Sequence, residues 1–233
     1  MATIADNLQA VIARIERAAR AARREAAAVR LVAVSKTHPA ALVEQARAAG
    51  QKAFGENYVQ EALEKMDALP GRGLEWHLVG PLQSNKTRLA AERFDWVHTV
   101  AAEKIARRLS EQRPAGCAPL NVLIQVNVSG EATKSGVSPD KILPLAQAIS
   151  VLPRLRLRGL MAIPEPTAEV KLQRERFSQV RNLFEKLKSE GLKIDTLSMG
   201  MSDDLEAAIA EGSTLVRIGT AIFGARKTAR EAA

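Results

Sequence analysis

Strand-like and helix-like patterns alternate along the chain. Short runs rich in Val, Ile and Leu, which are typical of buried strands, occur at residues 31–35, 52–55, 74–79, 96–100, 122–128, 155–162, 196–199 and 215–218. Between them, apolar residues recur at helical spacing in segments 40–49, 58–69, 85–93, 103–112, 139–152, 170–190 and 203–210. Strict alternation of strand and helix predicts a parallel sheet, and eight such steps close naturally into a (β/α)8 TIM barrel. The predicted fold class is therefore α/β.

An additional helix is predicted before the first strand, at about residues 3–27. Leu8, Val11, Ile12 and Ile15 form an apolar stripe that would pack against the bottom or an edge of the barrel. The opposite face is rich in arginine and is expected to be solvated. Composition does not shift along the chain, so residues 1–233 are predicted to form one ligand-binding domain, with residues 1–28 packed on the barrel.

Composition and charge limit the class of protein. The 233 residues are 46% hydrophobic and 26% charged, and no stretch approaches the roughly 18 apolar residues of a membrane-spanning helix. The net charge of +8 suits a small anionic ligand. Nucleic-acid binding is a minor option, because aromatic residues make up only 3% and base-stacking platforms are scarce. The single cysteine, Cys117, cannot form an internal disulfide, which predicts a reducing, cytoplasmic location.

In most strand–helix steps, polar and glycine-rich residues occur at the equivalent place, just beyond the carboxyl end of the strand. These positions are Lys36, residues 55–57, residues 80–86, residues 127–136, Met161 with Ala162, residues 198–202, and Gly219 with Thr220. In a barrel these ends lie on one rim, where barrel enzymes carry their binding and catalytic groups. Core packing does not explain this repeated placement, so we expect the ligand site on that rim.

Lys36 ends the first strand pattern as a single amine. The apolar run at residues 31–35 precedes it and Pro39 begins the next helix, so Lys36 lies at the turn of a strand–helix unit. Partial desolvation there favours the neutral amine, which can attack an aldehyde. Taken alone, a solvated lysine at the start of a loop is the more common case.

Two loops after the last strands predict a site for an anion. Residues 198–204 form a small, hydroxyl-bearing loop that opens a helix, and Gly219 with Thr220 forms a tight turn after Arg217. Backbone N–H groups in such loops favour phosphate, and barrels often hold phosphate at this place. Either loop alone is as well explained by a helix cap or an ordinary glycine turn.

Together, an amine and a phosphate site on neighbouring strand ends are what pyridoxal 5′-phosphate (PLP) requires. Arg217 would face the pyridine nitrogen and keep it unprotonated, because two adjacent cations repel. Such a ring is a weak electron sink.

Six segments resemble the pyridoxal phosphate homeostasis protein family. They are VSKT at 34–37, FGENYVQE at 54–61, WHLVGPLQSNK at 76–86, GEATKSG at 130–136, SMGMSD at 198–203 and GSTLVRIGTAIFG at 212–224. The resemblance implies a single-domain barrel like the N-terminal domain of alanine racemase, with Lys36 forming a Schiff base with PLP. It further implies that the cofactor is lined by Asn57, His77, Met161, Ser198, Gly200, Ser202, Arg217, Gly219 and Thr220.

The same resemblance favours a cofactor-holding protein over an enzyme. Alanine racemase needs a second base, a tyrosine from a separate β-domain, and this chain, which ends at Ala233, is expected to lack that domain. Its only tyrosine, Tyr58, is expected to begin a helix. We therefore expect a role in intracellular PLP homeostasis and supply, and in amino-acid and keto-acid balance, without robust catalysis. The alternative is a racemase-like PLP enzyme acting on a small amino acid.

Further expectations concern partners and individual side chains. PLP-dependent apo-enzymes are the expected recipients of the cofactor, and the chain is expected to be a monomer that binds neither nucleic acid nor membrane. Lys134 is a second amine on the predicted rim and is expected to hold cofactor in transit. His98 has no acidic neighbour in sequence and is interpreted as structural, and no residue cluster has metal-ligand spacing.

Overall fold

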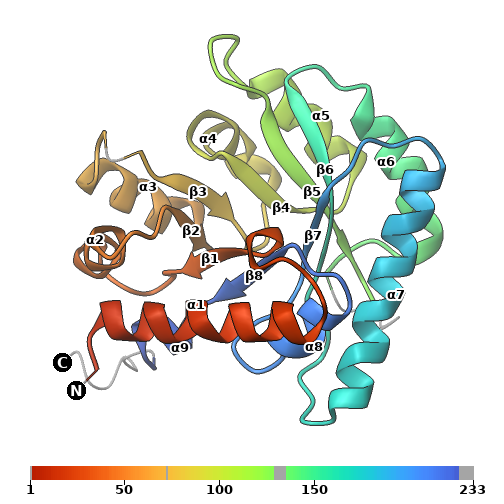
Figure 1. Ribbon diagram of the computed structural model, residues 1–233. Coiled ribbons are helices and arrows are strands. Elements are labelled where there is room, and N and C mark those ends of the chain that lie inside the picture. Colours follow the sequence, from red (N-terminus) through yellow and green to blue (C-terminus); the bar gives the residue numbers. More distant parts are fainter. Residues whose placement is uncertain (1, 72, 129–134, 226–233) are drawn as a thin grey trace.

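A computed structural model describes residues 2–71, 73–128 and 135–225. Within them, eight parallel strands form a closed barrel in chain order, and β1 completes the ring by pairing with β8 (Figure 1). The strands are β1 (Arg30–Val34), β2 (Ala53–Glu56), β3 (Glu75–Leu78), β4 (Trp96–Val100), β5 (Leu120–Val126), β6 (Leu155–Ala162), β7 (Thr196–Ser198) and β8 (Leu215–Ile218). The predicted (β/α)8 barrel is confirmed.

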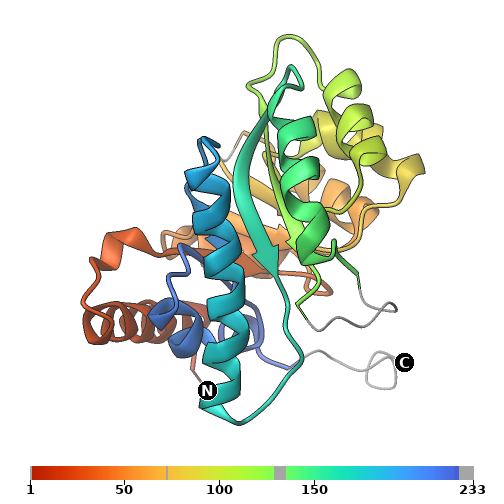
Figure 2. The same ribbon diagram turned by 90° about the vertical axis from the view of Figure 1, so that its right-hand side faces the viewer.

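Helices surround the barrel and cover the outward face of its strands. They are α2 (Ala40–Ala48), α3 (Val59–Ala68), α4 (Thr87–Arg93), α5 (Glu103–Gln112), α6 (Ile142–Ser150), α7 (Val170–Ser189), α8 (Leu205–Ala210) and α9 (Thr220–Phe223). Figure 2 shows the long helix α7 running along the outside of the barrel beside β6, which it contacts. The main hydrophobic core lies between this ring of helices and the strands. None of the described helices is both long and apolar enough to cross a membrane.

The helix that precedes the barrel, α1 (Ile4–Ala21), lies against α8 and α9 and also contacts α2 (Figure 1). Its first turn is closed by a capping box, in which Thr3 and Asp6 satisfy each other's backbone N–H groups. Leu8, Val11 and Ile15 are buried, as the apolar stripe predicts. The carboxylate of Glu206 in α8 pairs with Arg14 at 2.5 Å.

The structure differs from the predicted ranges mainly at element ends. The first helix ends at Ala21 rather than near residue 27, because Arg23 has a φ of +56°, a left-handed conformation that an α-helix cannot continue. Residues 26–28 instead form a short 3₁₀ turn. The fifth strand begins two residues earlier than predicted and ends at Val126, after which the Asn127 N–H bonds to the Val137 carbonyl.

The inside of the barrel is only partly apolar. Trp96, Leu123 and Met161 pack together as one interior cluster, and Val32, Ala53 and Leu215 form another. Four buried polar side chains from β3, β4, β7 and β8 share this interior, namely His77, His98, Ser198 and Arg217. Polar groups inside a packed barrel require hydrogen-bond partners, so their arrangement constrains the site above them.

Candidate functional site

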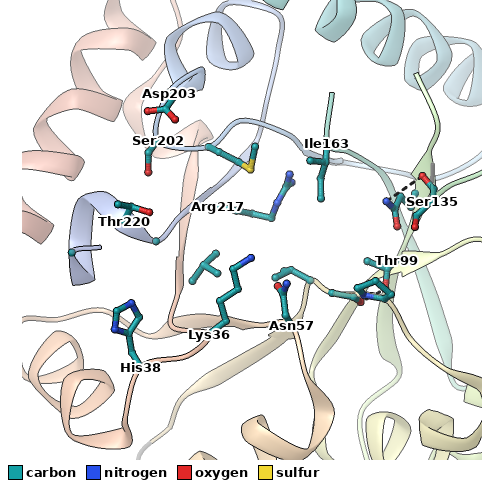
Figure 3. Close-up of a pocket in the computed structure, with 18 residues that line it drawn as sticks. Lys36, His38, Asn57, Thr99, Ser135, Ile163, Ser202, Asp203, Arg217 and Thr220 are labelled. Atoms are coloured by element: carbon teal, nitrogen blue, oxygen red, sulfur yellow. Dashed lines mark hydrogen bonds between the residues drawn. The ribbon is translucent and has the colours of Figure 1, made fainter. Parts of the chain in front are cut away.

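A cavity of about 460 Å³ opens at the carboxyl ends of the barrel strands. Six residues predicted for the site line it, namely Lys36, Asn57, Ser202, Arg217, Gly219 and Thr220. Figure 3 shows Lys36 and Arg217 reaching into it, with Ser202 and Thr220 on the neighbouring wall. Loops that are remote in sequence therefore meet on one rim, as the barrel prediction requires.

The amine of Lys36 is carried by a turn that begins where β1 ends. Lys36 is partly buried, and the buried Ser35 precedes it. Thr37, which follows, has a φ of +65°, an unusual value for a β-branched residue. Its N–H donates to the carboxylate of Glu61 in α3 at 2.5 Å. The side chain of Glu61 in α3 thus holds this turn in a strained conformation.

A buried lysine, Lys65 of α3, supports this turn from below. Its ammonium donates to the Ser35 carbonyl and to the carboxylates of Glu56 and Glu61, each at 2.7 Å. The Ser35 hydroxyl also donates to Glu56, at 2.5 Å. Burial raises the pKa of Glu56, and the nearby ammonium of Lys65 opposes that shift. Lys65 therefore contacts the residue before Lys36 directly, and the residue after it through Glu61.

Arg217 presents its guanidinium to the cavity from the barrel interior. Its side chain is almost wholly buried and donates to the Ser198 carbonyl at 2.6 Å, the Ser198 hydroxyl at 2.7 Å and the Ala162 carbonyl at 3.0 Å. Burial lowers the pKa of Arg217 to about 10, partly opposed by the charge of Asp204. The guanidinium therefore remains a cation at neutral pH, with three fixed acceptors.

The loop after β7 and the start of α9 form the third wall. Gly200 has a φ of +99°, and a Cβ at that position would lie 2.7 Å from the Cβ of Ala208. This turn therefore has no room for a side chain, and it directs Ser202 to the cavity (Figure 3). The first N–H groups of α9 have no acceptor inside the helix, as in any helix, and Thr220 adds a hydroxyl. This wall offers hydrogen-bond donors to an anion.

Four predicted residues lie outside the set that lines the cavity. Met161 is fully buried in an interior apolar cluster, and Gly200 lies in the turn behind Ser202. Ser198 and His77 are fully buried and belong to the hydrogen-bonded row described below. The structure thus places these four behind the cavity wall, and their contact with a cofactor stays a prediction.

Sequence reasoning missed several residues that line the cavity. Among them are His38, Thr99, Gln125 and Ile163. These four lie within a few residues of a strand's carboxyl end, which was the available signal, but nothing in their type marked them individually. Asp203 belongs to the loop predicted to bind an anion, although it was not named as a site residue, and it brings a carboxylate close to the donor wall (Figure 3). Lys134 lies outside the described residues, and its proposed transit role stays a prediction.

A row of hydrogen bonds crosses the barrel beneath the cavity. From the Ser198 hydroxyl it runs to His98 Nδ1 at 3.0 Å, from His98 Nε2 to His77 Nδ1 at 2.9 Å, and from His77 Nε2 to Glu75 Oε1 at 2.6 Å. Burial lowers the pKa of His77 and holds that of His98 well below its ordinary value. In the part of the chain that the structure describes, no cluster of His, Cys, Asp or Glu is arranged to hold a metal ion.

Replacement of Lys65 tests its role as a support. In Lys65→Met the carboxylate of Glu56 is left buried without its cation, so the free energy of unfolding should fall by about 3–5 kcal/mol. Urea denaturation measures this loss. Lys171→Met, on the exposed side of α7, should change stability by less than about 0.5 kcal/mol.

A double variant separates charge from packing. Adding Glu56→Gln to Lys65→Met removes the uncompensated charge and should recover part of the lost stability. An equal or larger loss in the double variant would show that Lys65 acts through packing alone.

The two buried histidines predict an acid sensitivity. The unfolded chain binds a proton at each histidine as pH falls below about 6.5, whereas burial disfavours protonation of both histidines in the folded chain. Because the pKa values of both histidines are depressed in the folded chain, the free energy of unfolding keeps its full value above that pH. Below that pH it falls by up to about 1.4 kcal/mol per pH unit for each histidine. Denaturation series between pH 7 and pH 5 should show a shallower slope for His98→Asn than for the parent chain. An unchanged slope would contradict the neutral state of His98.

Comparisons with known proteins place this geometry in context. The family model described as alanine racemase, N-terminal domain, matches residues 7–227. A pyridoxal phosphate homeostasis protein of Pseudomonas aeruginosa is 62% identical over 226 residues, covering 97% of each chain. The protein of the same name from Escherichia coli K12 is 56% identical over 229 residues, covering 97% of this chain and 98% of the relative.

Solved structures agree with the sequence comparison. PipY of Synechococcus elongatus PCC7942, solved with PLP bound, is 36% identical and superposes with a TM-score of 0.83, covering 95% of this chain and all of PipY. An alanine racemase of Clostridium difficile 630 is 15% identical, with a TM-score of 0.74, covering 96% of this chain and 58% of the racemase. At that identity the racemase shows a shared fold.

Proposed function

This chain belongs to the pyridoxal phosphate homeostasis protein family and its barrel matches the alanine racemase N-terminal domain model, and we propose that it holds PLP as a Schiff base on Lys36. We further propose that it serves intracellular PLP homeostasis and supply, and thereby amino-acid and keto-acid balance, rather than robust catalysis. The observation that carries the proposal is the meeting of Lys36, Arg217 and a donor wall in one cavity.

The groups around the cavity fit the aldehyde and the phosphate of PLP. The Lys36 amine can condense with the aldehyde, forming a C=N bond and releasing the aldehyde oxygen as water. Ser202, Thr220 and the first N–H groups of α9 provide uncharged donors for the phosphate. The cavity volume of about 460 Å³ is within the usual range for a site of this kind. PLP, when bound, supplies an electrophilic ring on which carbanions can be stabilised.

Arg217 supports holding over catalysis. Its cation has three protein acceptors, so it is fixed in place before any ligand enters. A fixed cation facing the pyridine nitrogen disfavours protonation of that nitrogen, which weakens the ring as an electron sink. Lys36 would then retain the cofactor without readily labilising the bonds of a bound amino acid.

A racemase-like activity on a small amino acid is the alternative, and the shared racemase fold is the observation that favours it. Such an enzyme needs an acid–base group on each face of the cofactor. Of the described residues that line the cavity, His38 and Asp203 are the titratable groups besides Lys36 and Arg217. Solvent deuterium incorporation into alanine, abolished in Lys36→Ala, would establish this alternative and overturn the holding role.

The covalent link is tested by trapping it. Borohydride reduction of PLP-treated protein, followed by peptide mass spectrometry, should find the pyridoxyl group on Lys36, and Lys36→Ala should lose the visible imine band. Lys104→Ala, an exposed lysine of α5, should retain both signals. A pyridoxyl group found mainly on another lysine would refute the assignment.

The donor wall is tested by comparing two ligands. Thr220→Val removes one hydrogen bond to the phosphate and should weaken PLP binding by about ten-fold to a hundred-fold, because hydrogen bonds to charged groups contribute about 1.5–3 kcal/mol. Binding of pyridoxal, which has no phosphate, should change by less than two-fold. Equal losses for both ligands would show that Thr220 does not contact the phosphate.

Recipient apo-enzymes, a monomeric state, a cytoplasmic location and a single domain over residues 1–233 remain predictions within this proposal. A pull-down that compares PLP-loaded with PLP-free protein addresses the recipients. Sedimentation velocity addresses the oligomeric state.

A further inference from the structure

The hydrogen-bonded row beneath the cavity reaches from Arg217 to the opposite rim of the barrel. Ser198 accepts from Arg217 Nη1 at 2.7 Å, and the row continues through His98 and His77 to Glu75. Glu75 is the first residue of β3 and therefore lies at the end of the barrel away from the cavity. Its carboxylate is about one-third exposed there, whereas both histidines are fully buried.

Glu75 is an ionised acceptor. Arg30, the first residue of β1, pairs with the same carboxylate oxygen at 2.9 Å. Burial acts to raise the pKa of Glu75, but the hydrogen bond from His77 and the charge of Arg30 oppose it, and the pKa of Glu75 lies below its usual value. An ionised carboxylate has no proton to give, so the atom facing it at 2.6 Å, His77 Nε2, must carry one.

The proton on His77 Nε2 determines which atoms donate and which accept in the other hydrogen bonds of the row. A neutral imidazole with a proton on Nε2 has a bare Nδ1, so His77 Nδ1 accepts from His98 Nε2. His98 then carries its own proton on Nε2, and its bare Nδ1 accepts from the Ser198 hydroxyl. Because that hydroxyl proton points at His98, the oxygen's lone pairs are left for Arg217.

We propose that Glu75 orients the row His77–His98–Ser198, so that a carboxylate at one end of the barrel positions the guanidinium of Arg217 at the other. His77, His98 and Ser198 are positioning residues in this account, since they act through Arg217. In the reverse arrangement His77 would donate to His98, and His98 would donate to Ser198 from Nδ1. His77 would then carry a proton on both nitrogens, and its positive charge would be added to a buried interior that already contains Arg217. The effect on PLP rests on the function proposed above, whereas the direction of the row does not.

The stacking of rings around the row keeps its geometry. The indole of Trp96 lies nearly parallel to His77, with ring centroids 5.3 Å apart and an interplanar angle of 10°. It meets His98 edge-on, with centroids 5.9 Å apart. The imidazole planes therefore cannot rotate freely to reverse their donors and acceptors, and the direction depends on where the protons lie.

Nitrogen-15 NMR shows which nitrogen of each imidazole carries the proton, and therefore which atom donates in each hydrogen bond of the row, without any cofactor. The chain has three histidines, so long-range ¹⁵N–¹H spectra of the cofactor-free protein are simple to assign, with His38→Asn identifying the third. At pH 7 we expect His77 and His98 both neutral and protonated on Nε2. A doubly protonated His77, or a proton on His98 Nδ1, would overturn the proposal.

Two substitutions of Glu75 test its control of the row. Glu75→Gln keeps an acceptor oxygen and should preserve both tautomers, whereas Glu75→Leu removes it and should give mixed tautomers at His77 and His98. A single, unchanged tautomer at both rings in folded Glu75→Leu would show that Glu75 does not set the direction. If Glu75→Leu does not fold, a changed tautomer in Glu75→Gln counts against the proposal in the same way.

The consequence for the cofactor is measured separately. Release of PLP should be faster in Glu75→Leu by about five-fold, the factor expected from weakening one buried hydrogen bond, and near the parent rate in Glu75→Gln. Asp67→Leu is the control, because it breaks the Arg93–Asp67 ion pair between α4 and α3, two helices outside the barrel, and neither residue is part of the row. Equal acceleration in Asp67→Leu would reduce the role of Glu75 to general stability. Failure of PLP to bind at all would refute the proposed function and leave the NMR result standing.

Discussion

The burial of a cation, Arg217, is the constraint on which much of this structure depends. A guanidinium inside a barrel is costly unless acceptors surround it, and here they are the carbonyls of Ser198 and Ala162 and the hydroxyl of Ser198. These groups belong to β6 and β7, so one side chain from β8 ties three strand ends together. The peptide N–H of Arg217 also bonds to the Gly200 carbonyl, which links the guanidinium's strand to the loop that carries Ser202.

A second buried cation, Lys65, serves the opposite wall in a similar way. It binds the carbonyl of Ser35 and two carboxylates, and one of these holds the N–H of Thr37. Buried ion pairs contribute little net stability compared with apolar packing, because desolvation offsets their attraction. Their effect here is positional: Lys36 and Arg217 each project from backbone that a buried charge network holds in place.

Some of the site was predictable from sequence because it depends on local pattern and on topology. Parallel strands in a closed barrel bring their carboxyl ends to one rim, so Lys36, Asn57, Ser202, Gly219 and Thr220 could be grouped although up to about 180 residues separate them. His98 shows the limit of this reasoning. No acidic residue adjoins it in sequence, yet it connects to Glu75 through His77, a link made across two strands whose relative register sequence does not reveal.

The sequence by itself determined the alternating pattern, the barrel and the amine at the end of β1, because these follow from hydrophobic periodicity and strand order. Tertiary structure alone decided which polar side chains face the cavity and which lie beneath it. Met161, Ser198 and His77 are buried, whereas His38, Thr99 and Asp203 line the wall. The physical reason is that strand twist, register and close backbone approaches set the direction of each side chain. An example is Gly80, where a Cβ would lie 2.2 Å from the Asn57 carbonyl oxygen, and such approaches arise only when distant segments pack.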